Sequence, residues 1–145
     1  MTEILIKRLS KQITLPKYET TGSSGMDLAA NIMESINIDP GKTAIIPTGL
    51  ALSIPKGFEI QIRPRSGLAA KKKITVLNTP GTIDSDYRGE IKVILFNHGS
   101  KEFIVNNKDR IAQMILTPVI KIDLEETDNL PETIRGEGGF GSTGK

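Results

Sequence analysis

Apolar and polar residues alternate along much of the first two-thirds of the chain. The clearest case is residues 58–63, in which Phe58, Ile60 and Ile62 occupy every second position between polar residues. This period of two is typical of a strand with one buried face. Shorter apolar runs lie between turns rich in Gly, Pro, Asn and Asp, at residues 4–6, 26–30, 43–52, 74–76, 91–96, 103–105 and 110–116. The pattern predicts an all-β fold.

Residues 64–73 are the one stretch with helical character, and they follow the alternating strand directly. Ser66 is the expected N-cap of this short helix. The free N–H groups of a first helical turn attract anions, so Arg65, Ser66 and Gly67 could together bind a phosphate. An ordinary capped helix explains the same three residues, and the motif is too short to decide between the two.

The turn at residues 78–91 carries the densest group of polar side chains, and it reads N-T-P-G-T-I-D-S-D-Y-R-G-E-I between two apolar runs. Two strands joined by a long polar turn fit this pattern. The turn gathers an amide, two carboxylates, a phenol and a cation, which is more chemistry than a connection requires. A hairpin with a solvated tip is the simpler alternative. The residues concerned are Asn78, Asp84, Asp86, Tyr87 and Arg88.

Two features mark the end of the chain. Gln113 interrupts the apolar run at residues 110–116, and a buried amide needs hydrogen-bond partners, so it faces either the main chain or a ligand. Residues 135–145 then form a glycine-rich arm around Phe140, without the pattern of a packed element. Such an arm is flexible, and its N–H groups also suit phosphate binding. We therefore expect one domain at residues 1–134 and an arm after it.

Composition narrows the possible functions. The chain has 145 residues, of which 37% are apolar and 14 are Gly, and this suits one globular domain. It has no Cys and a single His, His98, which we expect on the surface, so any metal must be held by oxygen ligands. A net charge of +2 does not favour duplex nucleic acid as a partner. With no apolar run long enough for a bilayer and no signal-peptide pattern, the sequence predicts a cytoplasmic protein without a membrane partner.

Five short motifs occur in order along the chain. They are G-M-D-L-A-A at residues 25–30, R-P-R-S-G-L-A at 63–69, the turn at 78–91, R-I-A-Q-M-I at 110–115 and R-G-E-G-G-F-G-S-T-G at 135–144. By these motifs the chain resembles the trimeric deoxyuridine triphosphatases (dUTPases) over nearly its whole length. The resemblance implies a jelly-roll-like β-barrel with one short helix that assembles as a homotrimer. It also implies active sites built from three chains and closed by one C-terminal arm, which hydrolyse dUTP to dUMP and pyrophosphate with Mg²⁺ on the triphosphate.

The resemblance assigns roles on the nucleoside side of the site. Asp84 matches the family's catalytic carboxylate, which takes a proton from the water that attacks the α-phosphorus and also meets the 3′-hydroxyl. Tyr87 resembles the ring that packs against the deoxyribose where a ribose 2′-hydroxyl would sit. The main chain of the hairpin resembles the part that reads the edge of uracil. The substrate-binding residues expected there are Asn78, Thr82, Ile83 and Lys92.

The other matches lie on the phosphate side. Asp27 resembles an outer-shell partner of Mg²⁺, which holds the waters of the ion and not the ion itself. Phe140 resembles a ring that stacks over the uracil when the arm closes. The family often has a glycine near Lys73, where this chain has three lysines, so we expect a different helix end. The remaining expected substrate contacts are Arg65, Ser66, Gly67 and Gln113 in the domain, and Arg135, Gly141, Ser142 and Thr143 in the arm.

Two alternatives stay open at this point. The deoxycytidine triphosphate deaminases, some of them bifunctional, share the fold, the glycine-rich tail and the Arg-Ser pair, and incubation with dCTP separates them from a dUTPase. A regulatory module that binds nucleotide without turnover is the second alternative, which pyrophosphate release from dUTP would exclude. The complete hairpin motif, the presence of Asp84 and the short chain favour the hydrolase.

Overall fold

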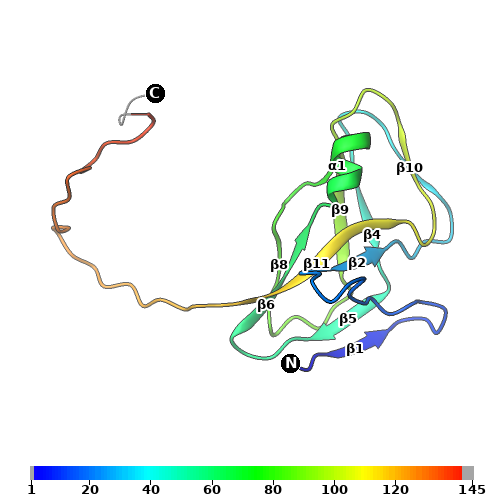
Figure 1. Ribbon diagram of the computed structural model, residues 1–145, viewed down its shortest axis with the longest axis horizontal. Coiled ribbons are helices and arrows are strands. Elements are labelled where there is room, and N and C mark those ends of the chain that lie inside the picture. Colours follow the sequence, from blue (N-terminus) through cyan, green and yellow to red (C-terminus); the bar gives the residue numbers. More distant parts are fainter. Residues whose placement is uncertain (1, 142–145) are drawn as a thin grey trace.

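Eleven strands and one short helix make up the part of the chain that the computed structural model describes, residues 2–141 (Figure 1). The all-β expectation with a single helix is therefore confirmed. In chain order the elements are β1 (Leu5–Arg8), β2 (Met26–Ala29), β3 (Ile36–Ile38), β4 (Thr43–Pro47), β5 (Leu50–Ser53), β6 (Phe58–Arg63), α1 (Ser66–Lys72), β7 (Ile74–Val76), β8 (Gly81–Ile83), β9 (Lys92–Asn97), β10 (Phe103–Val105) and β11 (Arg110–Pro118). No helix among the described residues is long and apolar enough to cross a membrane.

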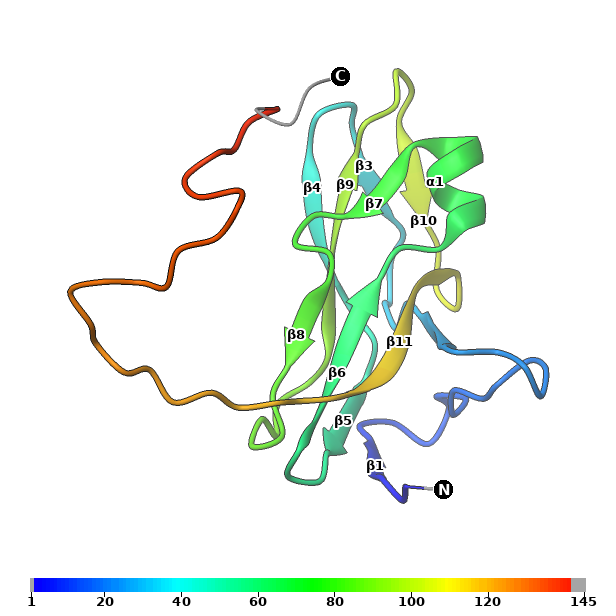
Figure 2. The ribbon, with the colours of Figure 1, turned by 60° about the vertical axis from the view of Figure 1, so that its left-hand side comes forward.

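The strands form two larger sheets and two pairs, and neighbouring strands are antiparallel throughout. One sheet has the order β2-β11-β6-β8 and the other the order β4-β9-β7, while β1 pairs with β5 and β10 with β3. The sheet β4-β9-β7 stands beside the sheet that contains β6 and β8 (Figure 2). Most neighbours in a sheet are distant in sequence, so the fold brings residues of different motifs together.

The core is a single cluster of aliphatic side chains that both larger sheets share. Ile60 and Ile62 of β6 are 2% and 3% exposed, whereas Gln61 between them is half-buried, as the alternation predicted. Val93 and Leu95 contribute in the same way from β9. Since aliphatic burial stabilises by roughly 25 cal/mol per Å² of apolar surface, this cluster is the main source of stability and the scaffold of the loops.

Strand β11 contains a β-bulge that the sequence pattern did not predict. Arg110 pairs with Ala29 on β2 and Ala112 with Leu28, so Ile111 is an extra residue on β11. Ile111 and Ala112 are consecutive and both buried. Because a bulge breaks the period of two, Arg110 and Gln113 lie on the same outer face of the sheet instead of on opposite faces.

The helix was predicted correctly, but its start was not. Arg65 is the N-cap residue, in an extended conformation and without a side-chain cap hydrogen bond, and Ser66 is the first helical residue. The side chain of Arg65 is instead bonded to Asp27. This bond holds the chain at Arg65, one residue before the cap position that we expected at Ser66. At the other end Lys73 adopts the left-handed conformation, with φ of 61°, that glycine usually takes at a helix end. Lys73 thus takes the conformation that a glycine would supply, and the different helix end that we expected is not seen in the main chain.

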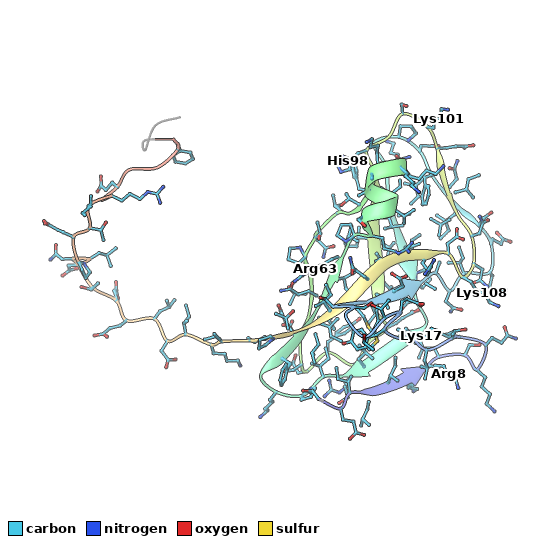
Figure 3. All side chains as sticks on the ribbon, viewed as in Figure 1. Arg8, Lys17, Arg63, His98, Lys101 and Lys108 are labelled. Carbon is cyan, nitrogen blue, oxygen red and sulfur yellow. The ribbon has the colours of Figure 1, made fainter. Side chains whose placement is uncertain are left out.

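Residues 119–141 form neither strand nor helix and extend away from the sheets (Figures 1 and 2). Regular structure thus ends with β11, and the domain boundary expected at residue 134 stays a prediction. His98 is exposed, as expected, and its ring centroid lies 4.2 Å from that of Phe96 (Figure 3).

Asn97 is the one fully buried amide side chain among the described core residues, and it ties the end of β9 to two neighbouring segments. Its Nδ2 donates to the carbonyl oxygens of Ile38 and Lys101, both at 2.8 Å, and its Oδ1 accepts from the N–H of Gly99 at 2.8 Å. All three bonds go to main-chain groups of other residues.

Replacing this amide should be costly. We expect Asn97→Ala to lower the free energy of unfolding by about 3 kcal/mol, because buried polar groups lose their partners. The control is Asn107→Ala, which removes a single hydrogen bond to the N–H of Ile32 at an exposed site and should cost less than about 1 kcal/mol. Urea unfolding at one fixed protein concentration measures both. If the two variants lose the same free energy of unfolding, the buried bonds of Asn97 stabilise the fold no more than one exposed hydrogen bond does.

Candidate functional site

The paired strands β7 and β9 form a hairpin whose long connection, residues 77–91, contains β8 and borders an open hollow of about 280 Å³. Strand β8 leads directly into it, and β9 begins at its far wall. The side chains of several predicted site residues line this one hollow. They are Thr82, Ile83, Asp84, Tyr87 and Lys92, together with Glu90.

The ring of Tyr87 is held by the tip of the hairpin. Its hydroxyl donates to the carbonyl oxygen of Glu90 at 3.0 Å, and its N–H donates to the carbonyl oxygen of Asp84 at 3.2 Å. The ring lies over Gly89, where a Cβ atom would collide with the phenol oxygen. Arg88 also folds back and donates to the carbonyl oxygens of Ser85 and Tyr87, at 2.7 and 2.9 Å. The turn is thus held by its own hydrogen bonds, although residues 86–89 at its tip are exposed to solvent.

The base of the hairpin is tied to the corner between β4 and β5. The Oε1 of Glu90 accepts from the N–H of Gly49 at 2.9 Å. The buried hydroxyl of Thr48 donates to the carbonyl oxygen of Ile91 at 2.6 Å. Gly49 has φ of 68°, and a Cβ atom there would collide with Ile13, so this corner requires glycine. These contacts fix the hairpin to the core.

Asp84 follows β8 directly and is exposed at the hollow. Its carboxylate makes no hydrogen bond or ion pair with any residue in the range 2–141. An exposed carboxylate with free lone pairs beside a hollow is available to a ligand or a water molecule. Asp86, two residues later, is also exposed but does not line the hollow.

A smaller hollow of about 30 Å³ lies beside the first and shares Thr82, Ile83 and Lys92 with it. Asn78 lines this second hollow, close to Gly81, where a Cβ atom would come within 3.2 Å of the Asn78 amide nitrogen. The structure therefore brings Asn78 to the same hairpin as the other predicted uracil-reading residues.

A second group of candidates meets on the outer face of the sheet where β2, β11 and the start of α1 come together. The two oxygens of Asp27 accept from different arginines: Oδ1 from Nε of Arg65 at 2.9 Å, and Oδ2 from Nη1 of Arg110 at 3.1 Å. Nη1 of Arg65 also donates to the carbonyl oxygen of Arg110 at 3.2 Å.

Gln113 lies next to this group. It pairs with Asp27 on one side and Arg63 on the other, and its Nε2 donates to the carbonyl oxygen of Pro64 at 2.9 Å. Its Oε1 lies over Gly25, where a Cβ atom would come within 2.7 Å. Gln113 thus supports the main chain immediately before Arg65, while Ser66 and Gly67 are exposed in the first turn of α1.

The hairpin hollow and the arginine cluster lie at opposite ends of β6. Ile83 pairs with Ile60, so Asp84 lies level with the start of β6, whereas Arg65 follows its end. Six residues of extended chain separate these levels by about 20 Å. Arg65 is moreover tethered to Asp27, on the side of β6 away from β8. One chain therefore does not bring Asp84 and Arg65 to the same ligand atom.

The arm residues are not brought to either place. Phe140 is fully exposed, and Arg135 belongs to the segment at residues 119–141 that extends away from the sheets (Figure 1). Gly141 ends the described part, and the predicted contacts Ser142 and Thr143 lie outside the described residues.

The residues in the range 2–141 contain no group of three or more Asp, Glu, His or Cys side chains that could hold a metal directly. Asp27 is the predicted magnesium partner, and each of its oxygens already accepts one arginine hydrogen. A carboxylate has about four lone-pair positions, so two stay free for water molecules. This geometry fits contact with a hydrated ion and does not favour direct ligation.

Sequence reasoning missed three supporting residues, Gly89, Glu90 and Arg110. Gly89 and Glu90 position Tyr87, and Arg110 binds the Asp27–Arg65 pair. The signal for Arg110 was present in the order Arg-Ile-Ala, since two consecutive buried residues break the alternation and reveal a bulge.

Comparison with known proteins gives a consistent result. The family model described as dUTPase matches residues 11–144. The deoxyuridine 5′-triphosphate nucleotidohydrolase of Gloeothece citriformis (strain PCC 7424) is 53% identical over 142 residues, which are 98% of this chain and 97% of that protein. The protein of the same name from Maricaulis maris (strain MCS10) is 58% identical over 134 residues, with 91% and 88% of the two chains covered.

Solved structures are similar in fold at lower sequence identity. A mutant dUTPase of Staphylococcus bacteriophage 80alpha, solved with dUpNHpp, has a TM-score of 0.88 at 23% identity and covers both chains completely. A mutant dUTPase from phage phi11 of S. aureus, described with a structural Mg(II) ion, has a TM-score of 0.78 at 20% identity, with 88% of this chain and 98% of that chain covered.

Proposed function

The chain belongs to the dUTPase family, and from that membership we propose that it hydrolyses dUTP to dUMP and pyrophosphate. The structural observation that carries the proposal is the hairpin hollow, in which the uncommitted carboxylate of Asp84 lies beside the fixed ring of Tyr87. The reaction supplies dUMP for thymidylate synthesis and keeps uracil out of DNA, and we expect it to take place in the cytoplasm.

Asp84 acts as the general base in this proposal. A carboxylate that is not bonded to the protein can accept a proton from water, and a water held by it would attack the α-phosphorus in line with the leaving pyrophosphate. Asp84 would also accept a hydrogen bond from the 3′-hydroxyl of the sugar. The proximity of Tyr87 supports this assignment, since both groups face the same hollow.

The hairpin selects the nucleoside. Uracil would lie against the main chain of β8 and the start of β9, with Asn78, Thr82, Ile83 and Lys92 around it, because a hairpin edge offers donors and acceptors as a pairing base does. A thymine methyl would collide with that wall. The ring of Tyr87 would close the space at the sugar, so that a 2′-hydroxyl does not fit.

Arg65 and its neighbours bind the phosphates. The Arg65 guanidinium keeps free N–H groups beyond its bonds to Asp27 and Arg110, and such a group pairs well with phosphate oxygens. Ser66 and Gly67 add a hydroxyl and exposed main-chain N–H groups. Gln113 bonds the carbonyl oxygen of Pro64, directly before Arg65, and its amide can also contact a phosphate. Mg²⁺ on the triphosphate would neutralise charge, with Asp27 holding water molecules of the ion.

The active enzyme is a homotrimer in this proposal. The separation of Asp84 from Arg65 along β6 supports a site that takes its hairpin from one chain and its arginine cluster from another. The arm at residues 135–145 of a third chain would then close the site. Phe140 would stack on the uracil, and Arg135, Gly141, Ser142 and Thr143 would contact the phosphates and exclude bulk water.

The base is tested most simply by Asp84→Asn, which keeps the shape of the side chain and removes its basicity. We expect pyrophosphate release from dUTP to fall by roughly two to four orders of magnitude while dUTP still binds. Asp86→Asn is the matched control in the same turn and should retain activity. Assays with dUTP, dCTP, dTTP and UTP, with and without Mg²⁺, measure the effect. Near-native turnover of Asp84→Asn, or dCTP deamination by the unmodified chain, would contradict the proposal.

The selectivity for deoxyribose over ribose is tested by substitution of Tyr87. Tyr87→Ala should raise the kcat/KM for UTP relative to that for dUTP by roughly tenfold or more, because the ring no longer fills the space of the 2′-hydroxyl. Tyr87→Phe is the control, since it keeps the ring and loses only the bond to Glu90. If both rates fall with an unchanged ratio in Tyr87→Ala, selectivity resides elsewhere.

The shared site is tested by mixing two inactive variants. A trimer of Asp84→Asn has intact arms and no base, whereas a trimer truncated before Arg135 has bases and no arms. When the two are unfolded and refolded together, some mixed trimers will place an intact Asp84 under an intact arm of a neighbour, and activity should exceed the sum of the parents. Parents mixed without subunit exchange are the control. Mixed trimers that stay inactive would contradict a site shared between chains.

A further inference from the structure

We propose that Arg110 is a positioning residue that holds the guanidinium of Arg65 in its phosphate-binding orientation. This inference rests on the proposed function. Arg110 was not among the site residues predicted from the sequence. The inference starts from one observation: Arg110 bonds to Asp27 through its side chain and to Arg65 through its carbonyl oxygen.

The β-bulge of β11 puts Arg110 in this place. If Arg110, Ile111 and Ala112 formed a regular strand without a bulge, the alternation would turn Arg110 to the same face as Ala112, toward the core. With the bulge, Arg110 shares the outer face with Gln113 and lies diagonally across from Asp27 on β2. Bulges near ligand sites commonly re-aim one side chain in this way.

The bonds to Arg65 leave a defined part of its guanidinium free. Nε donates to Asp27 and Nη1 to the carbonyl oxygen of Arg110, at 2.9 and 3.2 Å. An arginine has five N–H donors, so the remaining ones, including both on Nη2, stay available. The Arg65 side chain is 27% exposed, which leaves that end of the group accessible to a ligand.

Arg110 also prevents a competing arrangement. A carboxylate and a guanidinium prefer to pair through two parallel hydrogen bonds. In the structure Asp27 does not make this fork with Arg65, because only Oδ1 accepts from Arg65 while Oδ2 accepts from Arg110 at 3.1 Å. Without Arg110, both Asp27 oxygens would be free for Arg65, and the fork would use donors that the phosphate needs. The second arginine also leaves the three-residue cluster with a net positive charge instead of a neutral pair.

The test compares two ligands that differ only in the phosphates. In Arg110→Met, we expect affinity for a non-hydrolysable dUTP analogue to fall roughly tenfold, while affinity for deoxyuridine is unchanged. Isothermal titration calorimetry with and without Mg²⁺ measures both. Arg110→Lys keeps a positive charge near Asp27 but not the planar guanidinium, and its loss of affinity for the analogue should be smaller than that of Arg110→Met. Arg8→Met is the matched control, because Arg8 of β1 is likewise an exposed arginine whose side chain is hydrogen-bonded, in its case to the carbonyl oxygens of Lys11 and Ile13 (Figure 3).

A second set of titrations separates positioning from direct contact. In an Arg65→Lys background, Arg110→Met should cause little further loss, since its effect passes through Arg65. A full tenfold loss in that background means that Arg110 binds the phosphate itself, and an equal loss for deoxyuridine means general damage to the fold. Either result overturns the inference, as does unchanged affinity for the analogue. If the unmodified protein does not bind the analogue, the proposed function fails and the inference falls with it.

Discussion

The antiparallel register of β6 is the constraint on which the arrangement of the site depends. It pairs with β8 so that Asp84 emerges at one end, and it delivers Arg65 at the other end, next to Asp27 of β2. An extended strand cannot be shortened, so a single chain keeps these groups about 20 Å apart. Chemistry that needs both must combine chains. The proposed homotrimer would then be part of the catalytic mechanism and not only a source of stability.

Much of the fold and of the hairpin could be predicted from local patterns. The period of two in residues 58–63 and the polar turn at residues 78–91 depend only on near neighbours in sequence, and both lie where the pattern placed them. The hairpin residues also meet because they are close in the chain, so the hollow that Asp84 and Tyr87 line follows from one stretch of sequence. The five motifs added the reaction, which no pattern of strands could supply.

The rest depends on contacts between distant segments. In the Asp27–Arg65–Arg110 cluster, Arg65 is 38 positions and Arg110 is 83 positions away from Asp27 along the chain, and no rule of sequence spacing connects them. Ser66 was misjudged as a cap because the tie between Arg65 and Asp27, invisible in the sequence, decides where the helix starts. The bulge at Ile111 differs, because the break in alternation is visible in the sequence. It can be recognised as a bulge only once β11 is paired with β2. The arm at residues 135–145 has no packed pattern in the sequence, and the contacts proposed for it require several chains and substrate.

The central claim is that water attacks the α-phosphorus of dUTP. Hydrolysis in water labelled with oxygen-18, followed by mass spectrometry of both products, tests it directly. Attack at the α-phosphorus places one labelled oxygen in dUMP and none in pyrophosphate, and this is the result that the account predicts. Label found in pyrophosphate with unlabelled dUMP would mean attack at the β-phosphorus, and it would contradict the role derived for Asp84 and the hairpin.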